Sequence, residues 1–130
     1  MPERATARCH CAGVEIEVAF PSRFCAHCYC SSCRTTHAAG VVTWIGFKRA
    51  QVRFIRGEEL VRDYESSPGT RRKFCSRCGT RLAFESDKGA WADEVHLPLA
   101  LFVTPVDRAP EGNAFAEERP DWAPLHGILE

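Results

Sequence analysis

Long apolar runs are missing from this sequence of 130 residues. The longest mostly apolar stretches, 41–47 and 97–103, are far shorter than the roughly 20 residues that a membrane-spanning helix needs. No apolar segment typical of a secretory leader follows the N-terminus, where Glu3, Arg4 and Arg8 supply charges. We therefore expect a soluble, cytoplasmic protein with no membrane partner.

An excess of charge is missing as well, since 17 Lys and Arg residues balance 17 Asp and Glu residues. A generic nucleic-acid-binding domain usually has a basic surface, so we expect no nucleic-acid partner. The charges are nevertheless unevenly distributed: segment 71–81 carries basic residues and no acidic ones, whereas acids dominate after residue 107. The basic segment is either a solvated face or a place that attracts a small anionic ligand.

Helical periodicity is also absent over any long stretch. Residues 14–20 instead alternate apolar and acidic side chains, which predicts a half-buried strand that ends at Pro21. Residues 52–56 and 60–64 are expected to pair as a hairpin, and 34–39 to form a helical turn stopped by Gly40. Further strands are expected at 41–47 and 81–85, and one more within 94–103, with Pro98 at a bulge or edge position.

The two ends of the chain show no strong pattern, so we expect 1–8 to be a loose arm and the Pro-rich C-terminal part to wrap the surface. The length fits one domain spanning 1–130. Trp44, Trp91 and Trp122 are expected to pack in or beside the core. Together these features predict a mainly β fold of small antiparallel sheets.

Cysteine is abundant, with eight residues in three groups. In the cytoplasm, such clusters indicate metal binding or catalysis more often than disulfides. Cys9 and Cys11 form one pair, and Cys75 and Cys78 form another. Two pairs from distant strands can complete a tetrahedral all-sulfur site, the geometry of structural zinc. Gly13 and Gly79 are expected to supply the positive φ that such turns require.

The third group contains Cys25, Cys28, Cys30 and Cys33. The last three can place three sulfurs on one ion, which leaves an open fourth position, as in catalytic zinc sites. Arg34 would then offset part of the negative charge. The spacing alone leaves other possibilities open: Cys25 or His27 could close the site, and Cys25 and Cys28 could be a thiol–disulfide pair.

The order of these motifs resembles the glutathione-dependent formaldehyde-activating enzyme (GFA) family, also called the centromere protein V family. The matching segments are C-H-C-A-G-V at 9–14, C-Y-C-S-S-C-R at 28–34, G-E at 57–58, Y-E-S-S-P-G at 64–69 and R-K-F-C-S-R-C-G at 72–79. The sequence departs from the family near 101–102 and at Asn113, where many members carry Asp and His.

The resemblance implies a β-tent-like fold with two zinc ions per chain. It assigns Cys9, Cys11, Cys75 and Cys78 to a structural zinc site, and Cys28, Cys30 and Cys33 to a catalytic one, with Cys25 as a spare. It further implies a carbon–sulfur lyase that joins a thiol such as glutathione to a small aldehyde, as in S-hydroxymethylglutathione synthesis. The basic segment 71–81 would receive the carboxylates of glutathione. The alternative is a non-enzymatic zinc-binding interaction module.

Overall fold

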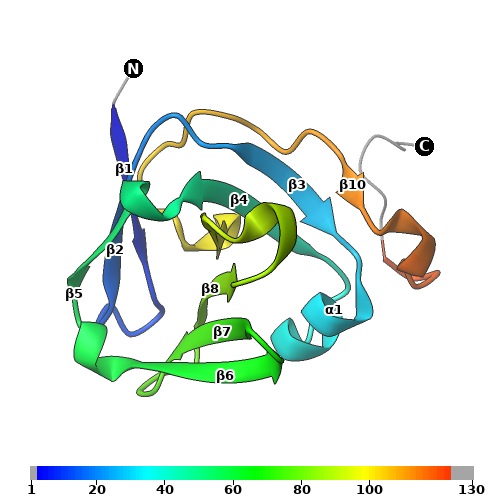
Figure 1. Cartoon of the computed structure of the whole chain (residues 1–130), viewed down its shortest axis with the longest axis horizontal. Coiled ribbons are helices and arrows are strands. Elements are labelled where there is room, and N and C mark those ends of the chain that lie inside the picture. Colours follow the sequence, from blue (N-terminus) through cyan, green and yellow to red (C-terminus); the bar gives the residue numbers. More distant parts are fainter. Residues whose placement is uncertain (1–2, 124–130) are drawn as a thin grey trace.

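Two β-sheets build the fold, and the larger one is strongly curved (Figure 1). The computed structural model describes residues 3–123. Residues 1–2 and 124–130, which belong to the expected arm and C-terminal wrap, lie outside the described part. Within it, no helix is long and apolar enough to cross a membrane.

The described residues form one α-helix and ten strands. They are β1 (Arg4–Arg8), β2 (Glu15–Ala19), β3 (Phe24–Cys28), α1 (Ser31–His37), β4 (Val42–Lys48), β5 (Val52–Arg56), β6 (Val61–Ser67), β7 (Thr70–Cys75), β8 (Arg81–Ser86), β9 (Glu94–Pro98) and β10 (Asn113–Ala114). Single 3-10 turns lie at Arg49–Gln51, Glu58–Leu60, Gly89–Trp91, Leu99–Leu101 and Ala116–Glu118.

The smaller sheet has the strand order β1-β2-β5, with antiparallel pairs. The predicted strand at 14–20 is confirmed as β2, where Ile16 and Val18 are fully buried. The prediction of a loose N-terminal arm is wrong for the described residues, because 4–8 form strand β1. Its alternation is easy to miss, since the buried positions are only Ala5 and Ala7.

The larger sheet has the order β10-β3-β4-β9-β8-β7-β6 and is antiparallel except for the short β10–β3 pair. The strands predicted at 41–47 and 81–85 are confirmed as β4 and β8. The strand predicted within 94–103 is confirmed as β9, which ends at Pro98, where a 3-10 turn follows.

The predicted hairpin between 52–56 and 60–64 is wrong. Strand β5 pairs with β2 in the smaller sheet, whereas β6 pairs with β7 in the larger one. Gly57, at φ 80°, and the turn after it carry the chain from one sheet to the other. The predicted helical turn begins earlier, at Ser31, and is capped by Ala38 in a left-handed conformation rather than stopped by Gly40.

Both sheets contribute to one core. Ile16 and Val18 from β2 belong to the same buried cluster as Ile45 and Phe47 from β4 and Leu97 from β9. The prediction of a mainly β fold of small antiparallel sheets is confirmed. A second, smaller buried cluster contains Cys28, Cys33, Val42 and Trp44, and it lies at the candidate site.

Candidate metal centres and the adjoining cavity

Four cysteine sulfurs converge where the turn after β1 meets the end of β7. The Sγ atoms of Cys9, Cys11, Cys75 and Cys78 all lie within 4.8 Å of one another. The Cys9–Cys11 sulfur distance is 3.6 Å and the Cys11–Cys75 distance is 3.9 Å. Four sulfurs at 2.3 Å from a tetrahedral zinc would be about 3.8 Å apart. This cluster could therefore hold a metal ion of that kind.

Each of the two turns that carry these cysteines contains one residue in the left-handed backbone conformation. Gly79 has φ 80°, as predicted. In the other turn, however, Ala12 has the positive φ, at 64°, and the expectation for Gly13 is wrong. A Cβ atom at Gly13 would overlap the guanidinium of Arg77, the end of an exposed and flexible side chain that would have to shift. The Arg77 Nε donates to the Cys11 sulfur at 3.4 Å.

Three further sulfurs meet between the end of β3 and the first turn of α1. The Sγ atoms of Cys28, Cys30 and Cys33 lie within 4.8 Å of one another, with 3.6 Å between Cys28 and Cys33. The helix start explains this arrangement, because Cys30 is the N-cap and its sulfur accepts from the Cys33 backbone N–H at 3.3 Å. These three residues could also hold a metal ion.

Strand geometry separates Cys25 and His27 from this second cluster. Successive side chains of a strand point to opposite faces, and Phe24, Ala26 and Cys28 line the cavity. Cys25 accordingly belongs to the main core, at 1% exposure, and burial raises the pKa of its thiol to about 11. The His27 Nδ1 lies 2.8 Å from Thr43 Oγ1. Among the described residues, the possible metal ligands grouped here are the three cysteines alone, without Cys25 or His27.

Arg72 of β7 supplies positive charge at the second cluster. Its Nη1 and Nη2 atoms lie 3.8 and 3.9 Å from the Cys33 sulfur, and its side chain is almost fully buried. A hydrogen bond from Cys28, together with Arg72, lowers the pKa of Cys33 to about 5. Arg34, which was expected to offset part of this charge, donates from its Nε to the Tyr29 carbonyl.

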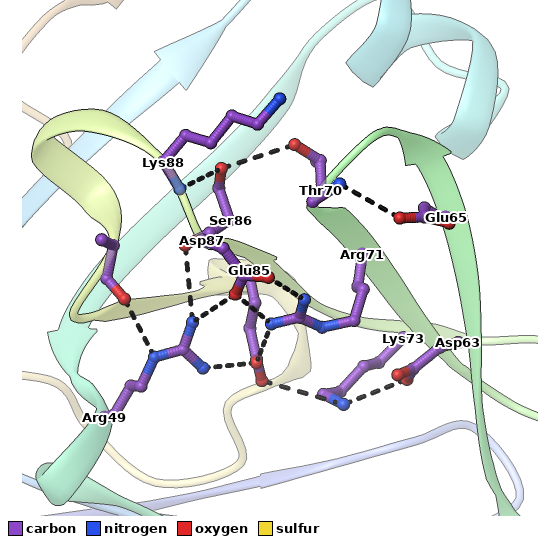
Figure 2. A network of polar contacts seen from close by, with 12 residues as sticks. Arg49, Asp63, Glu65, Thr70, Arg71, Lys73, Glu85, Ser86, Asp87 and Lys88 are labelled. Atoms are coloured by element: carbon purple, nitrogen blue, oxygen red, sulfur yellow. Dashed lines mark hydrogen bonds and ion pairs between the residues drawn. The ribbon is translucent and has the colours of Figure 1, made fainter.

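The basic segment 71–81 does not form one patch. Figure 2 shows Arg71 and Lys73 on one face of β7, where both pair with Glu85, and Arg71 also contacts Asp87. Arg72 points to the opposite face, and Arg77 contacts the first cluster. Arg71 and Lys73 are thus paired with acidic residues, whereas Arg72 and Arg81 both line a second pocket.

A cavity of about 280 Å³ opens beside the second cluster. Six of its sixteen lining residues carry rings, which come from β3, β4, β8, β9 and two connecting turns, and four others carry hydroxyl groups, namely Ser32, Ser66, Ser67 and Thr70. The ring-bearing residues are Phe24, Trp44, Phe84, Trp91, His96 and Phe115. Trp44 is buried as expected, but it and Trp91 also face this cavity.

Residues beyond the cysteine motifs therefore belong to the site. His96 is buried beside Phe24 and Phe84, and its Nε2 lies 2.9 Å from Glu94 Oε1. Burial lowers the pKa of His96. Sequence reasoning did not single out Phe84, His96 or Phe115, because only the strand register brings them to the cysteines.

Comparison with known proteins agrees with this geometry. Residues 4–118 match the family described as glutathione-dependent formaldehyde-activating enzyme. The chain belongs to the GFA family. It is also similar to the crystal structure of a Rhodobacter sphaeroides protein, with a TM-score of 0.62 and 25% sequence identity, over 74% of this chain and 85% of that chain. No match was found among curated proteins.

Proposed function

We propose that this GFA-family chain is a zinc-dependent carbon–sulfur lyase-like enzyme that acts on a thiol, such as glutathione, and a small aldehyde. The observation that carries the proposal is the three-sulfur cluster at the wall of an aromatic cavity. A closed structural site usually has four protein ligands, whereas a catalytic zinc site keeps one position for substrate.

The donor sets fit zinc at both clusters. All the grouped atoms are cysteine sulfurs, which are soft ligands that favour zinc over magnesium or calcium. We assign Cys9, Cys11, Cys75 and Cys78 to a structural zinc, and Cys28, Cys30 and Cys33 to a catalytic one. A zinc ion at the second cluster would act as a Lewis acid that stabilises a substrate thiolate.

The chain's own residues would perform the remaining tasks. Arg72 would partly balance the negative charge of the cysteine sulfurs, and the aromatic side chains would shield one side of the reacting groups from water. In the synthetic direction, the substrate sulfur forms a bond to the carbonyl carbon. The thiol proton is transferred to the carbonyl oxygen, so the product is a hemithioacetal. The lyase direction breaks the same carbon–sulfur bond and returns the proton to sulfur.

Metal analysis and turnover of matched variants test this assignment. We expect two zinc ions per chain in the wild-type protein and in Cys25→Ala, and one in Cys28→Ser. Wild-type protein and Cys25→Ala should form the glutathione–formaldehyde adduct, or a related one, faster than the spontaneous reaction, whereas Cys28→Ser should not. Two bound ions without any thiol-dependent turnover would favour the interaction module. Loss of the second ion in Cys25→Ala would contradict the three-cysteine assignment.

A further inference from the structure

We propose that the cavity recognises a substrate whose body is an uncharged aromatic or similarly flat apolar group, in preference to the charged body of glutathione. This inference rests on the proposed function and specifies the substrate class of the same site. Three features support it: the arrangement of the rings, the shortage of available charge in the lining, and the position of Phe115.

The rings form a continuous wall. Phe84 stacks on His96, with centroids 5.5 Å apart and planes 23° apart. Trp91 meets Phe84 edge-on at 6.2 Å, and Trp44 lies at 6.1 Å from Phe84 on another side. Aromatic side chains gain about 0.5–1.5 kcal/mol from such pair geometries in addition to the burial of apolar area. A flat apolar ligand could make the same kinds of contact with this wall.

Available charge is scarce inside the cavity. Among the described lining residues, Arg72 is the one that carries a permanent charge. Its guanidinium is already engaged by Cys33, Ser66 and Thr36, and it lies 5.1 Å from the Phe84 ring centroid. Glutathione brings carboxylates and an ammonium group, and a charge transferred into an apolar site without a partner is costly. The lining therefore disfavours the charged body of glutathione.

Phe115 is held at the mouth in a conformation that aromatic residues rarely adopt. Its φ is 56°, in the left-handed region, and its side chain is 45% exposed. The surrounding segment is tied to the cysteine loop, because the Tyr29 N–H donates to the Ala114 carbonyl at 3.0 Å and the Ser31 N–H donates to Glu118 Oε1 at 2.9 Å. Strained residues of this kind persist where surrounding contacts hold them, often at ligand sites.

The size of the cavity sets a lower limit on the size of the substrate, whatever its chemistry. The cavity volume of about 280 Å³ is many times the roughly 30 Å³ that one water occupies in the liquid. A one-carbon aldehyde is close to water in size and would leave most of the cavity unfilled. A substrate that fills it must therefore have a larger body on its thiol or aldehyde part.

Calorimetric titration of the zinc-loaded full chain with four probes measures how much the ring of a ligand and how much its thiol group contribute to binding affinity. The probes are benzyl mercaptan, benzyl alcohol, 2-mercaptoethanol and glutathione. We expect benzyl mercaptan to bind about 10- to 100-fold more tightly than 2-mercaptoethanol, from burial of the ring, and more tightly than glutathione. Phe115→Ala should weaken benzyl mercaptan several-fold and leave 2-mercaptoethanol unchanged. Trp91→Ala, at a second exposed ring, serves as an independent variant.

The outcomes distinguish this proposal from the proposed function. Glutathione binding as tightly as benzyl mercaptan, or equal weakening of both small thiols by Phe115→Ala, would overturn the aromatic substrate class. Benzyl alcohol binding as tightly as benzyl mercaptan would show that sulfur contributes nothing. In that case the thiol site of the proposed function fails, while recognition of the ring stands.

Discussion

The guanidinium group of Arg72 lies against the sulfur of Cys33, with Nη1 3.8 Å from Sγ. Arg77 has a similar relation to Cys11 in the other cluster, with Nε 3.4 Å from Sγ. Each cysteine cluster thus has one arginine at a sulfur, and the two arginines are five positions apart in the chain. This arrangement allows the two clusters to be perturbed separately.

Substitution of Arg72 by Gln should weaken metal binding at the second cluster alone. Partners that contact metal ligands typically change metal affinity by about 10- to 100-fold when they are removed. Arg77→Gln is the matched variant, and it should weaken the first cluster and leave the second unchanged. Competition with a chromogenic chelator, followed for each ion separately, measures both affinities. Equal weakening of both sites by either variant would contradict independent roles for the two arginines.

Two glycines with the same φ should differ in their tolerance of alanine. Gly57 and Gly79 both have φ 80°, but a Cβ at Gly57 would overlap the Gly13 carbonyl oxygen, whereas one at Gly79 meets nothing within 4 Å. Gly79→Ala should cost about 1–2 kcal/mol of unfolding free energy, from the left-handed backbone alone. Gly57→Ala should cost at least about 3 kcal/mol, since steric overlap adds to that strain. Urea unfolding of both variants measures the difference, and similar losses would contradict the steric argument.

Acid should destabilise the protein partly through His37. Burial, with further contributions from Arg72 and Arg81, lowers the pKa of His37 from 6.5 to about 4. The unfolded chain therefore binds a proton at a higher pH than the folded chain does, so stability falls as the pH drops from 6.5 towards 4. The ring packs edge-on against Trp44, with centroids 5.2 Å apart, and His37→Phe should retain that contact without titrating.

Unfolding free energies of both proteins at pH 7.5 and pH 5 test this expectation. Wild-type protein should lose about 1 kcal/mol more than His37→Phe, after allowance for solvent screening of a partly exposed group. Protonation of cysteine ligands and any release of metal affect both proteins and cancel in the difference. Equal losses in the two proteins would exclude His37 as a source of acid sensitivity.

The sequence predicted those parts of the fold that depend on strong local patterns. Alternation around Ile16 and Val18 identified β2, and the β-branched and aromatic run around Ile45 identified β4. Strand β1 was missed because alanine at its buried positions gives a weak apolar signal. The hairpin error has another cause: both segments are strands, but β5 pairs with the distant β2, which no local pattern specifies, and β6 pairs with β7 across the turn at 68–69.

The cysteine spacing and the resemblance to a family predicted the cysteine residues of the candidate site, but not the other residues around them. The structure groups the sulfurs of the two predicted clusters, and the alternation of β3 explains why Cys25 lies apart from them. The contact between Arg72 and Cys33 spans 39 positions, so it depends on where β7 and α1 lie in the fold. The aromatic wall likewise depends on the register of separate strands, which composition does not encode.

The position of the first cluster affects how the two sheets unfold. Cys11 and Cys75, 64 positions apart, bring together the turn of the smaller sheet and the end of a strand in the larger one. Closing a loop of that length costs on the order of 4 kcal/mol of chain entropy. A metal ion bound to both cysteines would offset this cost, but only while both sheets are intact. Zinc bound there would couple the sheets into one cooperative unit, so that amide exchange in β2 and in β7 would report the same opening event.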